Sequence, residues 1–81
     1  MIIHPEKVGA QISLLRKRKQ LTQTELGERL NISFQAVSKW ERGEGLPDTS
    51  ILGSLAHVLE TSVDNILFGG EQALQYKGKW L

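Results

Sequence analysis

The sequence predicts an all-α domain, a bundle of five short helices. Three observations lead to this prediction. Helix start signals occur five times in succession along the 81 residues. After each signal, apolar residues recur at spacings of three and four, as they do on the buried face of a helix. No segment alternates convincingly between apolar and polar side chains, so no strand is expected.

The first helix is expected over residues 5–19. Pro5 can occupy the first helical position, where its missing N–H is no loss. Val8, Ile12 and Leu15 then follow at spacings of four and three. The helix ends in a run of basic residues, which the negative end of the helix dipole stabilises.

The second helix is expected to begin after Thr22 and to run through Leu30. Thr22 and Glu25 stand three residues apart and predict a capping box, in which each side chain binds the other residue's backbone N–H. Leu21 and Leu26 stand where a hydrophobic staple would fix the start of this helix.

The third helix is expected over residues 34–42, capped by Ser33 and ended by Gly43. Only two residues separate the second helix from Ser33, so the two helices must cross steeply as a helix-turn-helix. Gly27 leaves no side chain where they would press together. Its cost of about 1 kcal/mol relative to alanine is acceptable if close packing offsets it.

Asp48 is expected to cap the fourth helix and Ser62 a short fifth helix, which Gly69 and Gly70 would end. We assign residues 5–69 to one domain, and residues 70–81 to a C-terminal tail or the start of a further domain. The apolar stripes of the last two helices are Ile51, Leu52, Leu55, Ala56 and Leu59, and then Val63, Ile66 and Leu67.

The composition, 40% hydrophobic and 23% charged, is that of one ordinary globular domain. The chain has no cysteine, and its two histidines, His4 and His57, are isolated, so no metal or other cofactor is expected. No apolar run is long enough to span a membrane and no signal peptide is recognisable, so a cytoplasmic location is expected. No small-molecule site can be identified.

Charge is unevenly distributed along the chain. Residues 1–42 carry eight Lys or Arg against four Asp or Glu, whereas residues 43–81 carry two against five. This asymmetry suggests an anionic partner for one face of the first half.

The third helix has two faces when its residues are placed about 100° apart. An amide, a hydroxyl, cations and an aromatic ring on one helix face can read DNA bases and contact phosphate. Any one such side chain alone would be better explained as part of a solvated surface. The prediction of DNA reading therefore depends on all of these side chains together and on the steep crossing of the two helices. The core side holds Ala36, Val37 and Trp40, and the outward side holds Gln35, Ser38 and Arg42, flanked by Phe34 and Lys39.

The segment LTQTELGERLNISFQAVSKWERGEGLPD resembles the helix-turn-helix of the lambda-repressor-like, Xre-type regulators. The matching motifs are T-Q-x-E-L, S-x-Q-x-V-S-x-W-E-R-G and P-D, and the resemblance extends from about Val8 to Phe68. It implies a five-helix DNA-binding domain over residues 5–69, whose third helix enters the major groove. It further implies a transcriptional regulator, typically a repressor, that binds a palindromic double-stranded operator as a homodimer.

The resemblance also implies roles for individual residues. Arg16 and Glu41 would form an ion pair that ties the first helix to the end of the third. Base-reading positions would be held by Phe34, Gln35 and Lys39, with Ser38 nearby, and phosphate would be contacted by Gln23, Arg42 and Thr22.

Two residues bear on how DNA would be bound. Phe34 stands where the family often has a polar or basic reader, so the operator cannot be inferred from relatives. We hypothesise that Phe34 packs on a thymine methyl or a sugar, and the alternative is that it belongs to the core. Asp48 places a negative charge near a potential phosphate site at the start of the fourth helix.

The sequence bears on two other classes of function, an enzyme and a protein-binding module. His57 lies close in sequence to Ser54 and Glu60, but no nucleophile elbow, phosphate-cradling loop or metal-spaced cluster accompanies them, so an enzyme is not expected. The serious alternative is a protein-binding module on the same fold, such as the antitoxin of a toxin–antitoxin pair or a regulatory adaptor.

Overall fold

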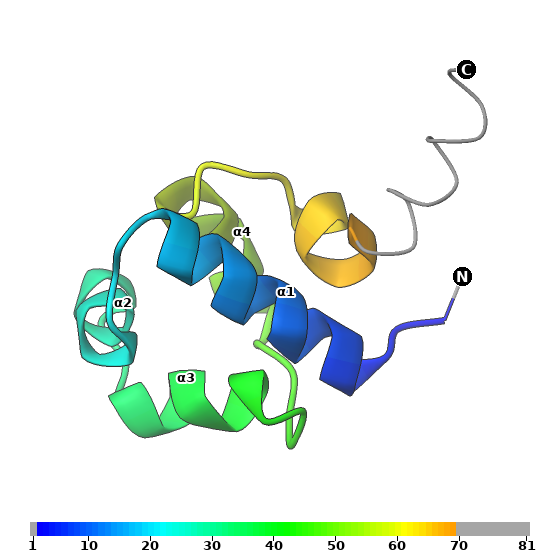
Figure 1. The fold of residues 1–81 in the computed structure, drawn as a ribbon, viewed down its shortest axis with the longest axis horizontal. Coiled ribbons are helices and arrows are strands. Elements are labelled where there is room, and N and C mark those ends of the chain that lie inside the picture. Colours follow the sequence, from blue (N-terminus) through cyan, green and yellow to red (C-terminus); the bar gives the residue numbers. More distant parts are fainter. Residues whose placement is uncertain (1, 70–81) are drawn as a thin grey trace.

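The computed structural model describes residues 2–69, which form five helical segments and no strand (Figure 1). The segments are α1 (Pro5–Arg18), α2 (Gln23–Leu30), α3 (Phe34–Glu41), α4 (Thr49–Val58) and a last helix over residues 63–69. The all-α prediction is confirmed. The proposed tail or further domain at residues 70–81 lies outside the described residues, as does Gly70.

α2 begins as its sequence predicts. The Glu25 backbone N–H donates to the Thr22 hydroxyl at 3.0 Å, and the Thr22 N–H donates to the Glu25 carboxylate at 2.8 Å. Leu21 and Leu26, on either side of this capping box, are both buried. The start of α2 is therefore fixed by hydrogen bonds on its solvent side and by apolar contacts on its core side.

The turn between α2 and α3 is short and tightly packed. Asn31 takes the left-handed conformation with φ 58°, and the Ile32 N–H donates to the Gly27 carbonyl at 2.8 Å. A Cβ on Gly27 would lie only 2.8 Å from the Ile32 carbonyl oxygen and 3.3 Å from the Phe34 nitrogen. The prediction that this helix crossing has no room for a side chain at Gly27 is confirmed.

The apolar core lies where the helices meet. α3 packs against both α1 and α2, and α2 packs against α4. The core side of α3 is the predicted one, because Val37 and Trp40 are buried and Ala36 packs against the core. The buried apolar residues are Val8, Ile12, Leu15, Leu21, Leu26, Val37, Trp40, Leu55, Ala56, Leu59 and Ile66.

α1 and α3 touch through their backbones at Gly9. A Cβ on Gly9 would lie 2.1 Å from the Trp40 carbonyl oxygen and 3.1 Å from the Glu41 Cα. Such a distance is far inside van der Waals contact, so this approach of the two helices requires glycine. The hydrophobic periodicity of α1 does not reveal this requirement.

α3 ends in a left-handed glycine turn. Gly43 has φ 74°, its N–H donates to the Trp40 carbonyl at 2.9 Å, and the Glu44 N–H donates to the Lys39 carbonyl at 3.0 Å. This pair of bonds is a Schellman motif, which satisfies the last carbonyls of the helix. Glu44 is thereby brought back beside the last turn of α3.

The caps of the last two helices differ. Ser62 accepts a hydrogen bond from the Asn65 N–H at 3.0 Å, as predicted. Asp48 occupies the N-cap position of α4, but its side chain accepts no hydrogen bond from the helix backbone, so the prediction that it caps α4 is wrong in this respect. Its Oδ1 instead accepts from the Thr49 hydroxyl at 3.5 Å.

Candidate nucleic-acid interface

α3 lies along one edge of the molecule, below α1 and α2 in Figure 1. Trp40 and Val37 hold its inner side to the core, so its other side faces solvent. The residues on that outer side are Phe34, Gln35, Lys39 and Arg42, which are exposed, and Ser38, which is half-buried. The structure thus brings the proposed base-reading residues together on the exposed side of one anchored helix.

Phe34 is an exposed aromatic ring at the first position of α3. It is 47% exposed and does not belong to the core cluster. Ser33, immediately before it, caps the helix by accepting from the Ala36 N–H at 3.4 Å. Phe34 thus lies outside the core cluster, and about half of its surface is accessible to a partner.

Arg16 and Glu41 join α1 to the end of α3. Arg16 Nε lies 2.7 Å from Glu41 Oε2, and a second guanidinium nitrogen donates to Glu41 Oε1 at 2.9 Å. The third nitrogen donates to the Leu21 carbonyl at 2.7 Å. The Arg16 and Glu41 side chains are only 11% and 8% exposed, so this pair is largely removed from solvent.

The charges of this pair stabilise each other. The hydrogen bond with Glu41 raises the pKa of Arg16 above its ordinary value. Burial acts to raise the pKa of Glu41, but hydrogen bonds from Arg16 and Gln23 outweigh burial and hold that pKa below its ordinary value. Both groups are therefore charged at neutral pH.

Gln23 is the first residue of α2 and belongs to the same network. Its side-chain nitrogen donates to Glu41 Oε1 at 3.1 Å. An amide nitrogen carries two N–H groups, so one remains for another acceptor. Thr22 beside it is exposed, and its hydroxyl accepts the capping bond while keeping its own hydrogen for donation.

Arg42 lies just beyond α3, where a carboxylate holds it. Arg42 Nε lies 2.7 Å from Glu44 Oε2, and another guanidinium nitrogen donates to Glu44 Oε1 at 3.4 Å. The remaining nitrogen donates to the Ser38 hydroxyl. The sequence gives no signal for the Glu44 contact, because it depends on the left-handed turn at Gly43.

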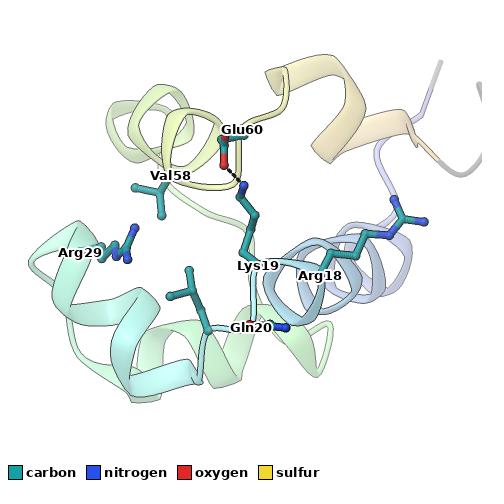
Figure 2. A pocket seen from close by; sticks show the side chains of 7 residues that line it. Arg18, Lys19, Gln20, Arg29, Val58 and Glu60 are labelled. Carbon is teal, nitrogen blue, oxygen red and sulfur yellow. Dashed lines mark ion pairs between the residues drawn. The ribbon is translucent and has the colours of Figure 1, made fainter.

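Some of the basic residues in the first half of the chain lie away from α3, around a cavity. A cavity of about 350 Å³ is lined by the C-terminal ends of α1, α2 and α4. Lys19 points toward Glu60 and pairs with it, while Arg18 points away from the other lining side chains (Figure 2). The cavity is lined by Arg18, Lys19, Gln20, Leu21, Arg29, Val58 and Glu60.

Within residues 2–69, no group of three or more His, Cys, Asp or Glu side chains is placed to hold a metal ion. None of the helices in that part of the chain is long and apolar enough to cross a membrane.

Comparison with known proteins gives matches over most of the chain. A family model described as helix-turn-helix matches residues 12–66. The HTH-type transcriptional regulator DicA of Escherichia coli is 42% identical over 64 residues, which are 79% of this chain and 47% of DicA. The HTH-type transcriptional activator BcrR of Enterococcus faecalis is 40% identical over 57 residues, which are 70% of this chain and 28% of BcrR. The chain thus spans less than half the length of each of these relatives.

A solved structure of similar fold contains DNA. It is the P22 c2 repressor protein in complex with a synthetic operator, which matches with a TM-score of 0.74 and 35% identity. The match covers 76% of this chain and 94% of that one. This chain is therefore similar to the P22 c2 repressor in both fold and sequence.

Proposed function

Because the chain belongs to the helix-turn-helix family of lambda-repressor-like, Xre-type regulators, we propose that it binds double-stranded DNA sequence-specifically and regulates transcription. The observation that carries this proposal is the outer side of α3, where polar, cationic and aromatic side chains are exposed on a helix fixed to the core by Val37 and Trp40. Such a helix can enter the major groove without rearrangement of the fold.

We propose that four residues read base edges. Gln35 offers a donor and an acceptor to adenine, and Lys39 offers donors to guanine. Phe34 packs on a thymine methyl or a sugar. Ser38 already accepts a hydrogen bond from Arg42, so its hydroxyl hydrogen is the group left for an acceptor on DNA.

Phosphate contacts are assigned to residues at the ends of α2 and α3. Thr22 and Gln23 lie at the start of α2, where backbone N–H groups and the helix dipole favour an anion. Arg42 lies at the end of α3 and supplies a positive charge. These contacts fix the position of α3 on the duplex and carry no sequence information.

We further propose that residues 5–69 are the DNA-binding domain of a cytoplasmic repressor that acts as a homodimer on a palindromic operator. The DNA complex of the P22 c2 repressor supports the repressor assignment. The similarity to the activator BcrR makes activation the competing outcome. An enzymatic role is not proposed, since these relatives are named as transcriptional regulators.

Selection of bound sequences from random DNA tests the proposal. The expected result is an enriched site with twofold symmetry, whose half-sites are about one helical turn apart. An enriched site without twofold symmetry would contradict the homodimer. Failure to enrich any sequence would contradict sequence-specific binding.

The salt dependence of binding separates this function from a protein-binding module on the same fold. Each cation that contacts phosphate contributes roughly −0.9 to the slope of log affinity against log salt concentration. A DNA reader therefore loses affinity steeply with salt. A flat response, together with no selected operator, would favour a protein partner such as a toxin.

A further inference from the structure

Glu44 is paired with Arg42, the residue to which the proposed function assigns a phosphate contact. Both its carboxylate oxygens lie within hydrogen-bonding distance of Arg42, at 2.7 Å and 3.4 Å. The two side chains are each 54% exposed, so the pair lies at the surface rather than in the core. A phosphate that approaches Arg42 from solvent therefore meets a carboxylate already bound there.

The backbone holds Glu44 in this position. Gly43 takes φ 74°, and the Glu44 N–H donates to the Lys39 carbonyl at 3.0 Å, so the chain folds back on the last turn of α3. The hydrogen bond with Arg42 lowers the pKa of Glu44, with smaller contributions from the charges of Arg42 and Lys39. Glu44 is therefore ionised at neutral pH, and it lies close to both cations of the proposed DNA-binding face.

We infer that Glu44 sets the strength of DNA binding by competing with backbone phosphate for the Arg42 guanidinium. The inference rests on the proposed function, because it requires Arg42 to contact phosphate. A solvent-exposed ion pair is weak, so phosphate can displace the carboxylate. Because the pair must break before Arg42 can bind phosphate, affinity is lower than it would be without the carboxylate.

The hydrogen bond between Arg42 and Ser38 determines whether neutralising Glu44 raises or lowers the affinity for DNA. The Ser38 hydroxyl lies on α3 itself and accepts from a guanidinium nitrogen of Arg42 other than the two that contact Glu44. When Glu44 is neutralised, Ser38 still holds the guanidinium beside the helix. Removal of the carboxylate should therefore free the charge of Arg42 without releasing its side chain.

The test uses the full chain and a fluorescently labelled duplex of random sequence, because a phosphate contact acts on all sequences alike. Glu44→Gln should raise affinity about two-fold to five-fold at low salt, and this gain should shrink as salt screens the charges. Asp64→Asn is the matched control, since Asp64 is an exposed carboxylate on the helix over residues 63–69. It changes the net charge equally and should leave affinity unchanged.

Arg42→Gln completes the test. It should lower affinity on its own and should abolish the gain from Glu44→Gln when the two are combined. Unchanged or weaker binding by Glu44→Gln, with unfolding unaltered, would overturn the inference. A gain that persists without Arg42, or an equal gain from Asp64→Asn, would overturn it as well.

Failure of DNA binding and failure of the competition by Glu44 would give different results. If Arg42→Gln weakens binding and Glu44→Gln has no effect, DNA binding through Arg42 stands and the competition does not. If the unmodified chain binds no duplex at all, the proposed function fails and this inference fails with it.

Discussion

At the scale of single residues, the Phe34 side chain should contribute more to DNA binding than to the stability of the fold. Phe34→Ala should lower the free energy of unfolding by about 1 kcal/mol or less, below the cost of about 3–5 kcal/mol for a core Phe, because the ring is 47% exposed and lies outside the core. The same substitution should weaken binding to the selected operator and alter preference at the base it contacts. Urea unfolding and competition binding measure the two effects. Marked destabilisation with unchanged operator preference would contradict this role.

Gln35 and Arg42 should show different kinds of defect. Gln35→Ala should relax preference at one base position, at a cost of about 1–3 kcal/mol with the preferred base. Arg42→Ala should weaken binding to all sequences alike and reduce the salt slope by about 0.9. Binding measured against a set of single-base operator variants distinguishes the two. A uniform loss for Gln35→Ala would show that it contacts phosphate instead.

The Arg16–Glu41 pair should be coupled energetically. Removal of Glu41 alone should cost about 1–3 kcal/mol, since it leaves the largely buried Arg16 charge with no carboxylate and removes the acceptor of Gln23. Replacing both residues of the pair by apolar ones should cost less than removing Glu41 alone. A double-mutant cycle on the free energy of unfolding checks this, and additive effects would contradict the coupling.

At the scale of the elements, two glycines on different helices should respond in opposite ways to the same substitution. Gly9→Ala should destabilise the fold by more than about 2 kcal/mol, because its Cβ would lie 2.1 Å from the Trp40 carbonyl oxygen and would push α3 away from α1. Gly53→Ala, on α4, meets nothing within 4 Å and should stabilise by about 0.5–1 kcal/mol. Thermal unfolding of both variants measures the contrast. Similar effects for the two would contradict the close approach at Gly9.

The helices are the part of the structure that local sequence specifies best. α1 and α3 end at Arg18 and Glu41, each one residue before its predicted end. The agreement is this close because the end of a helix depends on residues within one turn of it. The capping box at Thr22 is an example, since both of its partners lie within four residues. Asp48 shows the limit of such reasoning, because a suitable residue at the right position need not form the capping bond.

The candidate site is only partly predictable for the same reason. Helical periodicity alone predicts which side of α3 is exposed. The contact of Glu44 with Arg42 depends on the left-handed turn at Gly43, and the contact of Gln23 with Glu41 depends on how α2 and α3 meet. The bases that the exposed side chains contact depend on a partner that the chain does not contain.

At the scale of the whole molecule, stability should fall in acid. Hydrogen bonds and charge contacts hold the pKa of Glu41 below its ordinary value near 4.5, although its burial opposes them. The unfolded chain therefore binds more protons at acidic pH than the folded chain does. The stability from this group is present above about pH 4.5 and is lost as the pH falls through the lower, folded pKa. Urea midpoints at neutral pH and near pH 3 test this, and Glu41→Gln should show a smaller loss than the unmodified chain.

The Arg16 network has a consequence for how the domain opens. One guanidinium binds the Leu21 carbonyl before α2 and Glu41 at the end of α3, and Glu41 also holds Gln23 at the start of α2. Neither the start of α2 nor the end of α3 can detach without breaking bonds to the same two charges. These two helix ends should therefore exchange their protected amide hydrogens in a single cooperative opening, so that the helix pair is either wholly assembled or wholly released.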